Sequence, residues 1–189
     1  QVVWGLAKVK ESFELFKGDQ VDSYLLFSNF HRYGFSTDVR FTPIRVVCNN
    51  TLTLSLNQKV ENSVKISHRN KFDADVTKEM LGIAKDKLAQ YKEMASFLGS
   101  KKAKDENIVE YFNRIFPSTG RKDVSRNADR AMEVLHTQPG SNFAEGSWWQ
   151  PFNAVTFLTD HELGRNADSR LSSAWYGYNK SLKTKALEL

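Results

Sequence analysis

The alternation of apolar and polar residues in the first third of the chain predicts antiparallel β structure. Gly18-Asp19 and Tyr33-Gly34 have the composition of turns, and they separate apolar segments rich in β-branched and aromatic residues. Pro43 has no N–H group, so it marks a strand edge, a bulge or the end of a strand. The predicted strands lie at 2–9, 12–16, 22–30 and 37–47. Their spacing of about ten residues is typical of a meander.

The segment after Pro43 fits two structures. Residues 51–56 alternate between polar and apolar like a strand, yet Leu52 and Leu56 also share one face of a helix. In the second case Asn49 or Asn50 would cap that helix. A further strand is predicted over residues 60–67.

The second half has helical periodicity. Its clearest element is predicted over residues 75–100, with Asp75 as the N-cap and Gly99 as the residue that follows the last turn. Apolar residues repeat there at spacings of three and four, which is a coiled-coil-like seam: Leu81, Ala84, Leu88, Tyr91, Ala95 and Leu98.

Four more helices are predicted after the long one. Pro151 falls in the first turn of the third of them, where proline is tolerated, and Gly177 interrupts or kinks the last. The four ranges are 105–116, 126–136, 147–163 and 169–189. The sequence therefore predicts one α+β domain over residues 1–189, mainly β over 1–67 and mainly α over 75–189. In this fold an antiparallel β meander packs against the helical half.

Composition narrows the class of protein. Of 189 residues 40% are hydrophobic, which argues against a disordered chain, and no apolar run approaches the roughly 20 residues of a membrane span. The lone Cys48 cannot form an internal disulfide, so we expect a reducing compartment, the cytoplasm. The chain starts with Gln1 inside a strand-like run rather than with Met. We therefore expect that an N-terminal segment of the full-length protein is absent.

The sequence makes no positive case for an enzyme. No Walker, GxSxG or GxGxxG pattern occurs, and the four His and one Cys have no metal-ligand spacing. Asp160-His161-Glu162 is the densest polar cluster, but consecutive residues of a helix point in different directions, so a solvated turn of helix is the favoured interpretation. Cys48 follows two valines and is interpreted as a buried, inert thiol. We predict no catalytic residue, metal or cofactor.

Charge gives the one functional hint. The net charge is +5, and residues 59–104 alone carry eleven Lys and Arg against six Asp and Glu. Cations with interleaved aromatics favour nucleic acid, through phosphate neutralisation and base stacking. The candidate residues here are His68, Arg69, Lys71, Phe72, Lys101, Lys102 and Lys104, joined by Lys180 and Lys183 in the last helix. Acidic residues interrupt these cations, so an ordinary solvated surface is the alternative.

The aromatic cluster Trp148-Trp149-Gln150-Pro151-Phe152 also has two interpretations. It could form a binding platform, but apolar residues at 148, 152, 155 and 158 follow the periodicity of a helix packed on a core. Core packing is therefore favoured.

Three stretches of the chain resemble the DUF932 family of phage and plasmid proteins. The first is the strand pair at residues 24–29 and 39–52, and its most specific block is Phe41-Thr42-Pro43-Ile44-Arg45-Val46-Val47-Cys48-Asn49-Asn50-Thr51-Leu52. The others run from Trp148 to Glu162 and from Leu171 to Leu187. The resemblance favours a short helix over the strand at 51–56. It implies an association with mobile DNA, but no established catalytic residue.

Within the first stretch, polar residues interrupt an apolar block and need partners. Arg40, Arg45, Asn49 and Asn50 are therefore added to the candidates, although Asn49 and Asn50 could simply cap a turn. Arg45 could equally pair with a carboxylate such as Asp38. Taken together, the sequence predicts a non-enzymatic DNA-binding module, with single-stranded DNA favoured and a homo-oligomer possible. The alternative is a structural protein that self-associates, or binds a host protein, through the seam and the terminal helix. Convergence of the cations on one groove would favour DNA.

Overall fold

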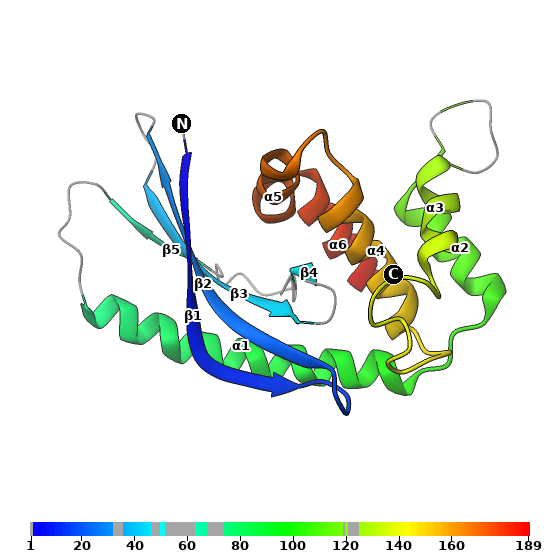
Figure 1. The fold of residues 1–189 in the computed structure, drawn as a ribbon, viewed down its shortest axis with the longest axis horizontal. Helices are drawn as coiled ribbons and strands as arrows, with labels where there is room; N and C mark the ends of the chain where they lie inside the picture. Colours follow the sequence, from blue (N-terminus) through cyan, green and yellow to red (C-terminus); the bar gives the residue numbers. More distant parts are fainter. Residues whose placement is uncertain are drawn as a thin grey trace.

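The first third of the chain forms an antiparallel sheet in the computed structural model, which describes residues 2–31, 36–46, 50–51, 63–67, 74–118, 120 and 125–189. Neighbouring strands follow the order β1-β2-β3-β4, and β5 also pairs with β3 (Figure 1). The strands are β1 (Val2–Glu14), β2 (Gln20–Phe30), β3 (Thr37–Arg45), β4 (Asn50–Thr51) and β5 (Ser63–Ile66). The predicted meander and the α+β class are confirmed.

Strand β1 joins two segments that were predicted as separate strands. Its pairing with β2 shifts in register between Lys8 and Ser12, so the irregularity bends one strand instead of ending it (Figure 1). The hairpin then closes at Gly18, which has a φ of 83°. Glycine adopts this left-handed conformation at little energetic cost because it has no Cβ. Asp19 follows directly, and its backbone N–H donates to the carbonyl of Phe16 at 2.8 Å.

Pro43 lies inside β3 rather than at its end. It sits opposite Ser23 of β2. On the other side of β3, β5 pairs with Thr37–Arg40 and β4 with Ile44 and Arg45. In the described part of the chain Pro43 therefore falls between the stretches of β3 that pair with β5 and with β4. The helix or strand predicted over 51–56 lies outside the described residues, apart from Thr51 in β4.

Helix α1 (Ala74–Ser100) confirms the long helix predicted over residues 75–100, but the two residues predicted to cap it lie within it. Asp75 lies in the first turn rather than at the N-cap, where its charge still suits the helix dipole. Gly99 lies inside the last turn. A Cβ there would come within 2.6 Å of the ring of Phe16, so the glycine allows the β1–β2 hairpin to pack closely on the helix.

The helical half contains α2 (Asp105–Ile115), α3 (Arg126–Val134), α4 (Trp149–Phe157), α5 (Ala167–Tyr176) and α6 (Tyr178–Glu188). Residues Leu158–Glu162 continue α4 as a short π-helix, η1, so the predicted helix at 147–163 is divided. Gly177 separates α5 from α6, as the sequence predicted.

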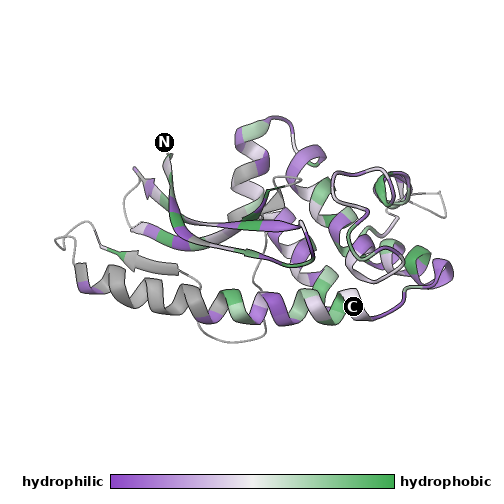
Figure 2. Ribbon diagram, turned by 60° about the horizontal axis from the view of Figure 1, so that its bottom comes forward, coloured by the Kyte–Doolittle hydropathy of each residue, from purple (hydrophilic) through white to green (hydrophobic). Residues whose placement is uncertain are grey.

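The hydrophobic core lies where the second half of α1 meets the helical half. Tyr91 and Ala95 of the predicted seam are fully buried there, in one hydrophobic cluster with residues of α2, α4 and α6. Figure 2 shows hydrophobic residues along this part of α1. Trp149 is also fully buried, and its ring contacts those of Tyr91 and Phe16 at centroid distances of 6.2 and 5.7 Å. The described C-terminal part of the seam therefore packs in the core of the domain.

Candidate nucleic-acid interface

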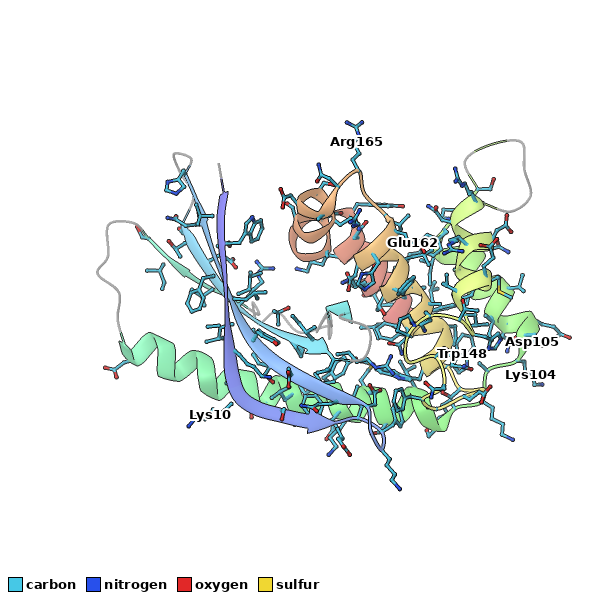
Figure 3. The ribbon with its side chains drawn as sticks, viewed as in Figure 1. Lys10, Lys104, Asp105, Trp148, Glu162 and Arg165 are labelled. Atoms are coloured by element: carbon cyan, nitrogen blue, oxygen red, sulfur yellow. The ribbon has the colours of Figure 1, made fainter. Side chains whose placement is uncertain are left out.

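Two of the predicted cations lie beside an aromatic cluster at the end of α1. Lys102 forms an isolated antiparallel bridge with Ser147, and the backbone N–H of Trp148 donates to the carbonyl of Lys101 at 2.9 Å. The basic linker after α1 is thereby fixed against the segment that precedes α4. Residues more than 40 positions apart in sequence come together in this way (Figure 3).

These residues border a pocket of about 510 Å³, which we call the aromatic–lysine pocket. Aromatic rings form much of its wall. Trp148 packs edge-on against Tyr111, with 5.3 Å between the ring centroids. The Lys101 ammonium lies 5.1 Å from the ring centre of Phe97, which is a cation–π contact. The lining residues are Phe97, Leu98, Lys101, Lys102, Tyr111, Trp148, Phe152, Ala186, Leu187, Glu188 and Leu189.

The electrostatics of the pocket suit an anionic ligand with a flat apolar part. Lys101 and Lys102 are both exposed, and among the described lining side chains Glu188 is the one carboxylate. The Tyr111 hydroxyl donates to the Ala186 carbonyl at 2.8 Å, and burial raises the pKa of Tyr111. The Tyr111 hydroxyl is therefore neutral, and it already donates its hydrogen bond within the protein. The pocket therefore offers lysine ammonium groups and ring faces to a ligand.

Phe97 and Tyr111 were not among the predicted site residues. Phe97 is 59% exposed although it lies on the helix next to the seam residue Leu98. An aromatic off the apolar face of an amphipathic helix was the available sequence signal. Core packing is confirmed for the cluster at 148–152, and two of its residues also border the pocket. Trp149 is core, half-buried Trp148 borders the pocket, and Phe152 does both.

Arg45 lies in the interior, where a phosphate cannot reach it. Its side chain is 0% exposed and pairs with Asp19 at 2.6 Å. It also donates to the Asn153 side chain at 3.0 Å and to the Gly140 carbonyl at 3.1 Å. The sequence therefore anticipated a carboxylate partner but named the wrong one, because Asp38 pairs with Arg40. The Arg45 network joins the sheet to α4.

Lys183 is likewise an internal residue. Its side chain is 0% exposed, and its ammonium lies 2.5 Å from Asp160. This contact also corrects the interpretation of residues 160–162 as a solvated turn. Asp160 is buried against α6, His161 lies beside the ring of Phe157, and Glu162 pairs with Arg130 of α3. The three side chains do diverge, as expected for consecutive residues of a helix.

Arg40 and Lys180 come near each other across the junction of β3 and α6. Burial lowers the pKa of Lys180, the positive charge of Arg40 lowers it further, and the carboxylate of Asp38 partly opposes both. Arg40 is held by a two-pronged contact with Asp38, at 2.8 and 3.0 Å. These cations lie apart from the aromatic–lysine pocket, since neither lines it.

Among the remaining predicted residues that the structure describes, Lys104 does not line the pocket. Lys104 is exposed at the start of α2 and lies beside Asp105 in Figure 3. The side chain of Asn50 is not described. His68, Arg69, Lys71, Phe72, Cys48 and Asn49 lie outside the described residues, so the structure does not place them.

A family profile described as domain of unknown function DUF932 matches residues 1–175. The chain belongs to the DUF932 family. The match covers nearly all of the sequence and includes the strand block with Arg40 and Arg45, the basic linker and Trp148. No curated protein and no solved structure matches the chain. Membership of DUF932 therefore supports the resemblance seen in the sequence but supplies no activity.

No group of three or more His, Cys, Asp or Glu in the described residues is arranged to hold a metal ion. No described helix is long and apolar enough to cross a membrane.

Proposed function

We propose that this DUF932 protein is a non-enzymatic DNA-binding module, with single-stranded DNA as the favoured ligand. The observation that carries the proposal is the meeting of Lys101 and Lys102 with exposed Phe97 and half-buried Trp148 at one pocket. Ammonium groups neutralise phosphates, and ring faces accept unpaired bases of any sequence. The resemblance to phage and plasmid proteins favours a role in recombination or maintenance of mobile DNA, in the cytoplasm.

Only some of the predicted cations lie together at the aromatic–lysine pocket. Lys101 and Lys102 share the pocket, while Arg45 and Lys183 are used in internal ion pairs. The proposed contact with DNA is therefore confined to one small region rather than spread along a basic groove. A small contact of this kind is expected to bind weakly as a monomer and to depend strongly on salt.

The test is a salt titration of binding to a fluorescently labelled single-stranded oligonucleotide and to its duplex, by anisotropy. The key variant is Lys101→Gln with Lys102→Gln. The matched control is Lys10→Gln with Arg165→Gln, which removes the same charge from exposed residues on other parts of the molecule (Figure 3). Each lost phosphate contact to a single strand lowers the salt slope by about 0.7, so the key variant should lower it by about 1.4.

With that slope, the wild-type protein loses about sevenfold more affinity than the key variant between 50 and 200 mM salt. The control variant should keep the wild-type slope. Absence of binding at about 50 mM salt, or binding that does not respond to salt, would refute the proposal.

A structural or interaction role is the second candidate, and a different observation favours it. Strand β1 lies at the edge of the sheet, and none of the described strands pairs with its outer side. It exposes Val3 and Leu6, at 51% and 50%. Exposed strand edges invite pairing with another chain. Light scattering distinguishes the candidates, because a dimer that Leu6→Lys converts to a monomer would support self-association through β1.

A further inference from the structure

The walls of the aromatic–lysine pocket have the shape and chemistry to receive one flat ring. Its volume of about 510 Å³ falls within the range of small-molecule sites. The rings of Trp148, Tyr111 and Phe97 lie on its walls, and Leu98 and Leu187 add apolar surface. Such walls favour an aromatic group that stacks, rather than a phosphate or sugar alone.

The charge of the pocket is unevenly placed and suits a ring that carries a phosphate. Lys101 and Lys102 both follow directly after α1, so the two ammonium groups come from one short segment. Lys101 already lies over the ring of Phe97. A base stacked near Phe97 would therefore bring its phosphate within reach of the neighbouring ammonium groups. The negative charge of the Glu188 carboxylate repels an anion and should weaken its binding.

The pocket has few groups that could read the edge of a base. The Tyr111 hydroxyl is committed to the Ala186 carbonyl, and the lysines are flexible point charges rather than paired donors and acceptors. Sequence-specific recognition needs hydrogen bonds to base edges. The site should therefore accept any base, with a preference set by stacking strength.

We infer that the aromatic–lysine pocket holds a single unstacked base of a DNA strand, with the adjacent phosphate bound by Lys101 and Lys102. This inference rests on the proposed function and adds the part of the ligand that is recognised. It also gives the physical reason for preferring single strands. A base in a duplex must first leave its stack and its pairing partner, which costs a few kcal/mol, whereas an unpaired base is already available.

The inference is tested with two oligonucleotides of equal length and charge, one of thymidines and one made entirely of abasic sites. Loss of stacking from one base is expected to weaken binding by about 5- to 140-fold. The same loss is expected for Phe97→Ala, whose side chain is 59% exposed and leaves no buried cavity. The matched control is Tyr178→Ala, which removes an exposed aromatic that does not line the pocket.

A second readout follows the base itself. A single 2-aminopurine in the strand should lose fluorescence when it stacks on an aromatic ring, and Phe97→Ala should reduce that loss. Equal affinity for the abasic and normal strands would overturn the inference while the proposed DNA binding stands. Failure of both strands to bind at low salt would overturn both. Equal weakening by Phe97→Ala and Tyr178→Ala would also count against a base in this pocket.

Discussion

Asp19 and Arg45 form a buried ion pair. We predict that removing the carboxylate and removing the guanidinium change the stability of the protein in different ways. Both side chains are 0% exposed. After Asp19→Asn the guanidinium remains buried with only neutral acceptors, from Asn153 and Gly140. Removing one partner of a buried pair costs about 3–5 kcal/mol, a large part of the 5–15 kcal/mol that stabilises a typical domain. We expect the free energy of unfolding to fall by about 3 kcal/mol, because Asn can still accept one hydrogen bond.

The reverse substitution, Arg45→Met, leaves a carboxylate in the interior. Burial already raises the pKa of Asp19, and loss of the neighbouring guanidinium should raise it further. A carboxylate can escape by taking a proton, whereas arginine cannot lose one. Between the unfolded pKa of about 3.8 and the raised folded pKa, the folded state binds more protons. The stability of Arg45→Met should therefore increase as the pH falls from 7 towards 5.

The assay is urea unfolding followed by circular dichroism at pH 7 and pH 5, for both single variants and the double variant. The double variant should be more stable than the sum of the two single losses predicts, because it leaves no unpaired charge. A loss of less than about 1 kcal/mol for Asp19→Asn would refute the reasoning, as would an Arg45→Met protein whose stability does not change with pH.

Three smaller predictions concern the region around η1. Glu162→Gln should cost less than about 1 kcal/mol at pH 7, because its pair with Arg130 is exposed. Arg130 lowers the pKa of Glu162 below 4.5. Urea titrations should therefore show that the difference in stability between the wild-type protein and Glu162→Gln disappears as the pH falls through that lowered pKa. Asn166→Ala removes the capping box of α5 and should cost about 0.5–2 kcal/mol by the same titration; a smaller loss would mean the box is dispensable. Gly164→Ala should lower the melting temperature, because φ is 146° and its Cβ would lie 2.5 Å from Cγ of Arg170, whereas an unchanged melting temperature would contradict that strain.

The order and type of the described elements follow from local patterns in the sequence. Alternation in the first third and periodicity of 3.6 in the second half depend on residues near each other in the chain, so both were predictable. The break at Gly177 was predictable for the same reason. The ends of the elements were less predictable. The sequence indicates Gly99 as the end of a helix, yet its lack of a side chain allows the contact with Phe16, which is 83 residues away.

The roles of the charged residues depended on tertiary structure. In the sequence Lys101, Lys180 and Lys183 are equivalent cations near aromatics. Folding buries Lys183 against Asp160, brings Lys180 near Arg40, and leaves Lys101 exposed beside Phe97. Such outcomes depend on which elements pack together, because burial and pairing are set by neighbours that are distant in the chain.

The sequence by itself thus determined an α+β chain of the DUF932 type, with its cations concentrated around one long helix. Only the tertiary structure decided which cations are available to a ligand and which stabilise the interior. The physical reason is that a charged side chain needs either water or a partner, and the fold determines which of the two each one has. For Arg45 the partner is Asp19, while Lys101 and Lys102 keep their access to solvent at the mouth of the aromatic–lysine pocket.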